Sequence, residues 1–407
     1  MAARKESLSV TTSDALQGRR TRRHLLLPLL IAVVLVLAGC TQARTAATQN
    51  WSGVAVDNDR VFVGTHDGRI IQLEAATGRP LAAPYIAPET DNAGVAAFYG
   101  TPTIAGGLLF AGGYQGIVYA MRAAGLDGAR TTELDGNALT KGVAGSVVPV
   151  DVPAAGAGDD LVVAAVAEDA NAGRVHVLSA DNLVEQCRYP ARGLAPIGQI
   201  WSTPTVVDGI VYVGTLDHEL HAMRVADCSA VWPEPADLHG AVVAPPFAMG
   251  DKVYVGTFDR RFYEVDRQTG EAEELFTADN WFWGGVASDG TRLFIPNLDG
   301  RLYTYDLQLG REGWTFSPED AGRTPILATP AVHGDTVITA SDSGLISILR
   351  TSDGGLEWDQ QAPGGAIRAP LTVSGDILYV HAVEGVVSAI DLEAKRLLWS
   401  QRLEDIP

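Results

Sequence analysis

The chain repeats one short segment, and this repetition limits the possible folds more than any other feature of the sequence. The segment "VYVGTFDRRFYEV" at residues 253–265 closely follows "VYVGTLDHELHAM" at residues 211–223. Related copies begin at residues 61, 109, 162, 211, 253, 293, 337 and 378. The spacing of 40 to 53 residues is typical of a β-propeller, in which each repeat forms one four-stranded sheet, or blade.

Each copy has the pattern expected of consecutive strands and turns. The apolar run "IVYVG" at residues 210–214 indicates a strand that neighbouring blades cover on both faces. The segment "LDG" at residues 298–300 predicts a turn into the alternating strand "RLYTYD" at residues 301–306. We therefore predict an all-β fold, an eight-bladed β-propeller of four-stranded antiparallel blades. Whole blades, each built from one stretch of the chain, should meet where the ring closes.

A second turn in each copy carries a fixed register. A turn residue stands four positions after the third strand, and it is glycine at positions 270, 310 and 354. Tryptophan stands eight positions after the third strand at positions 232, 314, 358 and 399. Glycine permits the positive φ of a tight turn, and the tryptophan falls where it can lie between adjacent blades.

This register resembles the repeat of pyrroloquinoline-quinone-type propellers, "AxDxxTGxxxW". The best matches are "EVDRQTGEAEELF" at residues 264–276 and "AIDLEAKRLLW" at residues 389–399. The resemblance extends over residues 51–407 and implies the same propeller fold. Departures occur at Ala82 and Glu274, which occupy the tryptophan position.

The amino-terminal residues have the pattern of an export signal. Basic residues precede the apolar run at residues 25–39, which is shorter than the roughly 20 residues needed to span a bilayer. The ending "LAGC" at residues 37–40 resembles the bacterial lipobox, in which the cysteine receives a diacylglycerol. We expect a lipoprotein signal peptide at residues 1–39, then lipidated Cys40 and a flexible tether to residue 50, and the propeller at residues 51–407. The alternative is an ordinary signal peptide with an incidental cysteine.

These segments predict a location in the bacterial cell envelope, outside the cytoplasm and anchored to a membrane. The membrane could be the outer membrane, facing the periplasm, or the outer leaflet of the cytoplasmic membrane. Export also permits a disulfide between Cys187 and Cys228, although the sequence does not establish that their sulfur atoms meet.

The charge of the chain excludes one class of partner. The formal charge is −19, and residues 1–39 carry +4, so the remainder carries −23. Such an acidic surface repels phosphate backbones, which makes nucleic-acid binding a poor hypothesis. It suits a monomeric propeller that binds a basic or neutral protein.

Quinoprotein dehydrogenases share the repeat, so a catalytic function has to be weighed. Many of those enzymes have adjacent cysteines beside the quinone, together with an acidic base and Ca²⁺ ligands. No two cysteines are adjacent here, and the carboxylates recur at turn positions. We therefore predict no catalytic residue, no cofactor and no metal. A quinone-dependent oxidoreductase and a ligand-sensing propeller that acts on a membrane partner are the alternatives.

The lipobox, short tether and eight repeats together resemble the outer-membrane assembly lipoprotein family BamB. This resemblance implies a non-catalytic scaffold that docks on a membrane-embedded insertase and steers exported proteins. Propellers usually bind through loops at the mouths of the central channel. We predict partner contacts from aromatic and arginine residues in the connections that enter each first strand, namely Trp201, Trp281, Phe282, Trp283, Arg323 and Arg368. The alternative is that these side chains plug the channel or brace neighbouring blades.

Overall fold

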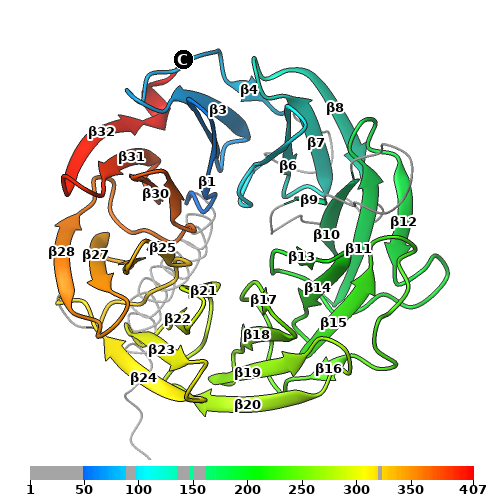
Figure 1. Cartoon of the computed structure of the whole chain (residues 1–407). Helices are drawn as coiled ribbons and strands as arrows, with labels where there is room; N and C mark the ends of the chain where they lie inside the picture. The colour runs from blue at the N-terminus through cyan, green and yellow to red at the C-terminus, as the bar shows by residue number, and fades with distance from the viewer. Residues whose placement is uncertain (1–48, 89–96, 135–146, 151–160, 170, 320–322) are drawn as a thin grey trace, which may run out of the picture. The chain divides into compact units, whose positions relative to one another are not determined.

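The computed structural model describes residues 49–88, 97–134, 147–150, 161–169, 171–319 and 323–407. Residues 49–407 form one compact unit, and their described part contains thirty-two strands in eight four-stranded antiparallel sheets. Figure 1 shows these sheets arranged in a ring. The predicted eight-bladed β-propeller is therefore confirmed.

The four strands of each sheet follow one another in the sequence. Sheet 1 contains β1 (Val54–Asp57), β2 (Arg60–Gly64), β3 (Arg69–Glu74) and β4 (Tyr85–Ile86), and sheet 2 contains β5 (Thr103–Ala105), β6 (Leu108–Gly112), β7 (Ile117–Arg122) and β8 (Asp127–Glu133). Sheet 3 contains β9 (Val148–Val150), β10 (Leu161–Asp169), β11 (Ala172–Ser179) and β12 (Glu185–Tyr189), and sheet 4 contains β13 (Thr205–Val207), β14 (Ile210–Gly214), β15 (Glu219–Arg224) and β16 (Ala236–Asp237).

The second half of the ring has the same organisation. Sheet 5 contains β17 (Phe247–Met249), β18 (Lys252–Gly256), β19 (Arg261–Asp266) and β20 (Ala272–Thr277), and sheet 6 contains β21 (Ala287–Ser288), β22 (Arg292–Pro296), β23 (Leu302–Asp306) and β24 (Arg311–Phe316). Sheet 7 contains β25 (Ala331–His333), β26 (Thr336–Ala340), β27 (Leu345–Arg350) and β28 (Leu356–Gln361), and sheet 8 contains β29 (Thr372–Ser374), β30 (Ile377–Ala382), β31 (Val386–Asp391) and β32 (Arg396–Arg402).

The ring closes between whole sheets, as the repeat predicts. The first strand of each sheet lies nearest the centre of the ring and the fourth lies at the periphery (Figure 1). The inner strands β1 and β29, from the two ends of the propeller, contact each other. Sheet 8 takes all four strands from the carboxyl-terminal end, so no strand crosses from one terminus to the other.

The core consists of apolar clusters between neighbouring sheets, which explains the continuous apolar runs in the sequence. In β18, Val253 and Val255 pack against Tyr212 of sheet 4, whereas Tyr254 between them packs with Leu293 of sheet 6. Successive side chains of a strand point to opposite faces, so a strand between two sheets must be apolar at every position. Eight such clusters occupy the eight junctions of the described ring.

Tryptophan and glycine interlock at the predicted register. The indole Nε1 of Trp399 in sheet 8 donates a hydrogen bond to the carbonyl oxygen of Ala75 in sheet 1, at 2.8 Å. The same ring covers Gly78, where an added Cβ would lie 2.4 Å from Trp399 and where φ is +71°. Trp232 covers Gly270 in the same way at the junction of sheets 4 and 5. At Gly78 and Gly270 the neighbouring indole therefore leaves no room for a side chain, and glycine also adopts the positive φ without strain.

The junction of sheets 3 and 4 has a disulfide at the position where other junctions have the tryptophan and glycine pair. Cys187 lies eight residues after the end of β11, which is the tryptophan position, and Cys228 lies four residues after the end of β15, which is the glycine position. The two cysteines are bridged, with 5.8 Å between their Cα atoms. The covalent bond thus joins neighbouring sheets at the register where Trp399 and Gly78 make their contact.

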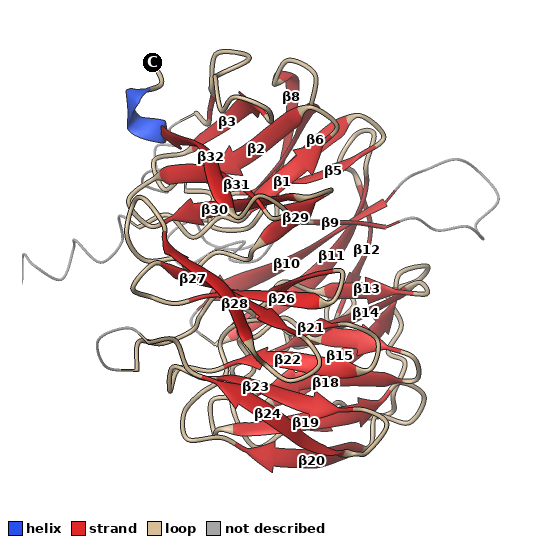
Figure 2. Ribbon diagram, turned by 60° about the vertical axis from the view of Figure 1, so that its left-hand side comes forward, coloured by secondary structure: helices blue, strands red, loops and turns tan. Residues whose placement is uncertain are grey.

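The strand connections separate onto two rims. Because strands alternate in direction, the turns between second and third strands share one rim with the connections from one sheet to the next; we call this the approach rim. The turns between first and second strands and between third and fourth strands form the opposite rim. Figure 2 shows the ring from a second direction, with the 3₁₀ helix Leu403–Asp405 following β32. Among the described residues, no helix has the length and apolar character needed to cross a membrane.

Candidate functional site

The connections on the approach rim are fixed by backbone hydrogen bonds to the turns on either side. In the connection that enters sheet 5, the N–H of Val242 donates to the carbonyl oxygen of Thr215 in sheet 4, at 2.9 Å. The N–H of Phe258 in sheet 5 donates to the carbonyl oxygen of the adjacent Ala241, also at 2.9 Å. This bridging holds the connection between two turns, so its side chains project from a rigid backbone.

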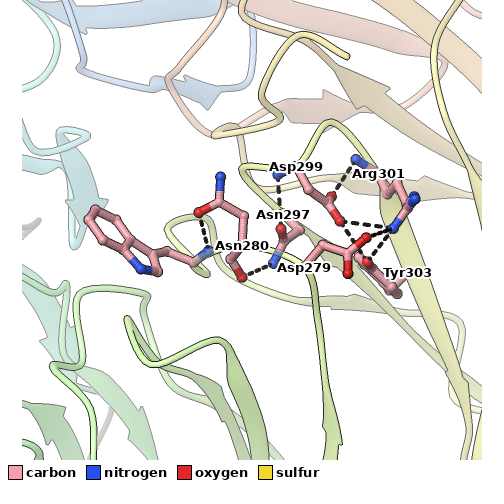
Figure 3. Close-up of polar contacts among 7 residues, drawn as sticks. Asp279, Asn280, Asn297, Asp299, Arg301 and Tyr303 are labelled. Atoms are coloured by element: carbon pink, nitrogen blue, oxygen red, sulfur yellow. Dashed lines mark hydrogen bonds and ion pairs between the residues drawn. The ribbon is translucent and has the colours of Figure 1, made fainter.

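The connection that carries Trp281 has an additional polar network (Figure 3). The backbone N–H of Trp281 donates to Oδ1 of Asn280 at 2.9 Å, and the carbonyl oxygen of Asn280 accepts from Nδ2 of Asn297 at 2.9 Å. Oδ1 of Asn297 in turn accepts the N–H of Asp299 at 2.9 Å. Asn297 and Asp299 belong to the turn between β22 and β23, so this turn fixes the position of the preceding connection.

Arg301 at the start of the third-strand segment completes this network. Its Nη1 lies 2.5 Å from Asp279, 3.2 Å from Asp299 and 3.1 Å from the hydroxyl of Tyr303. The hydrogen bond with Tyr303, followed by the one with Asp279, raises the pKa of Arg301, so the guanidinium stays charged in the folded protein. Asp279 stands two residues before Trp281, and its ion pair therefore anchors the start of the loop.

Aromatic rings form a continuous row from this loop toward the centre of the ring. Trp281 stacks on Phe258, with 4.9 Å between ring centroids and 14° between ring planes. The ring of Trp283 lies 5.8 Å from that of Phe258 and 5.5 Å from that of Trp51, measured between ring centroids. Trp51 precedes sheet 1 and Trp283 precedes sheet 6, and these sheets are not neighbours. The contact between the two indoles therefore reaches across the ring.

This arrangement gives Trp283 and Arg368 bracing functions. The guanidinium of Arg368 lies 5.5 Å from the centre of the Trp51 ring and pairs with the carboxylate of Asp342 at 2.6 Å. It also hydrogen-bonds to Gln49. Trp283 is partly buried between Trp51 and Phe258. The plugging and bracing alternative considered for these two residues thus has direct support in their contacts.

Phe282 does not lie at the surface, which corrects its prediction as a partner contact. Its side chain is buried in the cluster between sheets 5 and 6, with its ring 5.6 Å from that of Phe262. A Cβ added at Gly256 would lie 2.3 Å from the Cβ of Phe282. Trp281 and Phe282 are adjacent in the sequence, yet of the two only Trp281 is exposed.

Three of the predicted residues lie on the approach rim with exposed side chains. Trp201, in the connection that enters sheet 4, is 43% exposed, and Trp281 is 47% exposed. Arg323, in the connection that enters sheet 7, is also exposed and has a φ of +48°. Together with Tyr114 in the turn after β6, the two tryptophans are the exposed aromatic side chains of the described residues, and all three lie on this rim.

Sequence reasoning missed Trp51 and Phe258. Phe258 occupies the second position of the turn "TFDR", and the nearest copy has Leu216 there. Only this comparison between copies could have identified Phe258 as a candidate site residue. Cys40, the predicted lipidation site, lies outside the described residues. Within the described ranges, no group of three or more His, Cys, Asp or Glu side chains is placed to hold a metal ion.

Comparison with known proteins identifies the repeat. The family model described as "Outer membrane protein assembly factor BamB" matches residues 37–178, 162–273 and 298–406. The assembly factor BamB of Moranella endobia is 29% identical over 183 residues, which are 42% of this chain and 45% of the relative. The serine/threonine-protein kinase AfsK of Streptomyces griseus is 27% identical over 168 residues, 39% of this chain and 20% of the kinase.

The solved structures give the same result for the fold. The crystal structure of BamB from Moraxella catarrhalis matches with a TM-score of 0.62 and 18% identity, covering 83% of this chain and 92% of that structure. At this identity the likeness shows the fold alone. In sequence, the chain spans about half the length of the assembly-factor relatives it matches.

Proposed function

Because the chain belongs to the family described as outer membrane protein assembly factor BamB, we propose that it is a non-catalytic propeller that binds protein partners during outer membrane protein assembly. The family model matches residues in all eight repeats and leaves out residues 274–297. Relatives named as outer membrane protein assembly factors match about half of the chain. The partners are a membrane-embedded insertase and the exported proteins that it inserts.

The observation that supports this proposal is that the exposed aromatic side chains of the described residues lie on one rim. Tyr114, Trp201 and Trp281 all project from the approach rim, and the backbone around Trp281 is fixed by hydrogen bonds on both sides. Large aromatic side chains on a rigid backbone bind partners at low entropic cost, because little freedom is lost on association. A rim of this kind is suited to binding a protein surface and has no need of a deep pocket.

We also propose that the propeller is attached to a membrane through lipidated Cys40. The acyl chains on one residue provide stable anchoring, since each buried CH₂ contributes about 0.8 kcal/mol. Cys40→Ala should release the protein into the soluble fraction of lysed cells. Retention of this variant in membranes after a carbonate wash would contradict lipid anchoring.

The central test is photocrosslinking of the full-length protein in its native membranes. A photoreactive phenylalanine analogue replaces Trp281 on the approach rim or, as a matched control, Leu309 in the turn between β23 and β24 of the same sheet on the opposite rim. Both positions are exposed, at 47% and 62%. We expect capture of a membrane-embedded insertase from position 281 and not from position 309. Absence of any insertase adduct at exposed positions on either rim would refute the assembly function.

A ligand-sensing propeller is the second candidate, because the repeat also matches part of a serine/threonine-protein kinase. In the crosslinking experiment, capture of a kinase or a transporter would favour this alternative. Saturable turnover of an artificial electron acceptor after addition of pyrroloquinoline quinone and Ca²⁺ would instead contradict the non-catalytic proposal.

A further inference from the structure

The chain enters the propeller on the approach rim. The backbone N–H of Asn50 donates to the carbonyl oxygen of Val383, in the turn between β30 and β31 of sheet 8, at 3.3 Å. The side chain of Asn50 is buried, and its Oδ1 accepts the N–H of His66, in the turn between β2 and β3 of sheet 1, at 3.0 Å. Both turns lie on the approach rim, so the segment that leads into sheet 1 is fixed on that side of the ring.

Two further contacts fix this entry at the mouth of the central channel. Gln49 hydrogen-bonds to the guanidinium of Arg368, which in turn pairs with the carboxylate of Asp342 in sheet 7 at 2.6 Å. On the other side of the segment, the ring of Trp51 lies 5.5 Å from that of Trp283, which belongs to the connection into sheet 6. Residues of several sheets on the same rim therefore hold the start of the propeller in place.

The number of residues before this point limits how far a membrane anchor can reach. Cys40 stands nine residues before Gln49 in the sequence. A fully extended chain spans at most about 3.3–3.6 Å per residue, so nine residues reach about 30 Å. A lipid on Cys40 would therefore enter the membrane within about 30 Å of the channel mouth on the approach rim.

This reach is too short for the opposite rim to face the same membrane. A route around the outside of the ring first crosses the four strands of a sheet, which lie about 4.8 Å apart and so take about 14 Å. The route then follows a strand such as β3, whose six residues extend about 20 Å. These two parts use the whole reach and leave no length to arrive at the bilayer. The route through the channel is obstructed at its mouth by the contact between Trp51 and Trp283.

We propose that the short tether turns the approach rim toward the membrane, so that the propeller binds the part of a membrane-embedded protein that lies at the bilayer surface. The inference rests on the proposed attachment through Cys40 and adds the rim that this attachment selects. Tyr114, Trp201 and Trp281 are exposed on that rim. Their rings combine an apolar body with a polar group, which suits a contact surface close to the membrane interface. The opposite rim faces away from the membrane.

Energy transfer between the propeller and a vesicle tests this orientation. The lipidated protein is reconstituted in phosphatidylcholine vesicles that contain a lipid with an acceptor dye on its headgroup. An amino acid with a coumarin donor replaces Trp281 on the approach rim or, as the matched control, Leu309 on the opposite rim. Both positions are exposed, at 47% and 62%. We expect transfer from position 281 to be about twice as efficient as from position 309 or more, because the rims lie about one strand length apart.

A longer tether is the control for the cause of the orientation. An insertion of about thirty Gly and Ser residues between Thr48 and Gln49 adds roughly 100 Å of extended length, which is more than a route around the ring needs. The melting temperature should not change, because the insertion lies before the residues that contact the rim. Transfer from the two positions should become about equal, because such a linker is flexible. Transfer that stays larger from position 281 would show that the tether does not orient the propeller, and it would overturn the inference.

The outcomes separate this inference from the assembly function. Equal transfer from positions 281 and 309 with the natural tether, or failure of the protein to remain on the vesicles, would overturn the orientation proposed here. In either case, capture of an insertase from an exposed position in native membranes would still support the assembly function. Greater transfer from position 281, combined with the absence of any insertase adduct, would retain the orientation and reject the assembly function.

Discussion

The two rims of the propeller use the same local backbone for different purposes. On the opposite rim, left-handed turn residues such as Gly78 and Gly270 lie beneath an indole of the neighbouring sheet. On the approach rim, His218 and Arg260 adopt the same left-handed region and direct their side chains to solvent. The first arrangement packs neighbouring sheets together, and the second leaves the side chain in contact with solvent.

This difference depends on the neighbouring sheet, because an indole excludes a side chain at Gly78 and Gly270, whereas the side chains of His218 and Arg260 are exposed. A glycine beneath an indole satisfies both the turn and the packing, so nothing is gained by changing it. A histidine or arginine in the same conformation lowers stability and adds only an exposed side chain. Substitutions on the opposite rim should therefore affect folding, whereas substitutions of exposed residues on the approach rim should affect binding.

The largest effect is expected from loss of the Cys187–Cys228 disulfide. The bridge closes a sequence separation of 41 residues, and the chain-entropy relation gives about 4 kcal/mol for a loop of this length. The double variant Cys187→Ala/Cys228→Ala should lose a free energy of unfolding of this order in chemical denaturation. Reduction of the wild type with dithiothreitol should have the same effect. An unchanged denaturation midpoint in both experiments would show that the junction of sheets 3 and 4 does not depend on the bridge.

Trp399→Ala tests the closure of the ring at the opposite rim. The variant loses the indole contact with Gly78 and the hydrogen bond to Ala75, and it leaves a cavity between sheets 8 and 1. We expect a loss of about 2–3 kcal/mol in the free energy of unfolding, because Trp399 is only partly buried. Insertase adducts from a photoreactive residue at position 281 should be unchanged under conditions where the variant is folded. Fewer adducts without a loss of stability would contradict the division between the rims.

The register read from the sequence predicted much of the fold, including glycine at the tight turns and tryptophan between adjacent sheets, but not the contact between the two. The same register places Cys187 at the tryptophan position and Cys228 at the glycine position of the next sheet. It therefore marked both cysteines as residues of the contact between sheets. The pairing remained open because it depends on which side of each sheet the next one packs, and the repeat pattern alone does not give that side.

The candidate site was less predictable, because the arrangement of the loops is decided in three dimensions. The stretch "WFW" contains three similar side chains, yet Trp281 is exposed, Phe282 is buried and Trp283 contacts Trp51 across the ring. No local sequence pattern distinguishes the environments of these three side chains. The contact with Trp51 joins residues 232 positions apart in the sequence and depends on ring closure.

A decrease in pH should lower the stability of the fold through one buried residue near the approach rim, His381. His381 is fully buried, and its Nδ1 donates to the carbonyl oxygen of Ser52 at 2.9 Å, so the proton of the neutral ring resides on Nδ1. Nε2 has no hydrogen-bond partner among the described residues. Burial lowers the pKa of His381 to about 4 from its ordinary value of 6.5. Protonation is therefore more favourable in the unfolded chain, and stability falls as the pH decreases from 6.5 toward 4.

For this one group, the loss between pH 7 and pH 5 is about 2 kcal/mol. His381→Asn retains a donor toward Ser52 and cannot be protonated, so urea denaturation at the two pH values should show a smaller fall in stability than for the wild type. His239→Asn, which alters an exposed histidine, is the control. An equal fall in the wild type and in His381→Asn would show that other groups account for the acid sensitivity.

The smallest effect on stability and the largest on binding should come from the same substitution, Trp281→Ala. The side chain is 47% exposed, and the hydrogen bonds that fix its loop are made by its own backbone N–H and by the side chains of Asn280 and Asn297, so they remain in the variant. The free energy of unfolding should change by less than about 0.5 kcal/mol. Insertase adducts from a photoreactive residue at position 201 should nevertheless decrease, because a rigid aromatic contact on the same rim is lost. If Trp281→Ala instead unfolds as readily as Trp399→Ala, the indole stabilises the ring, and the approach rim is a second packing layer like the opposite one.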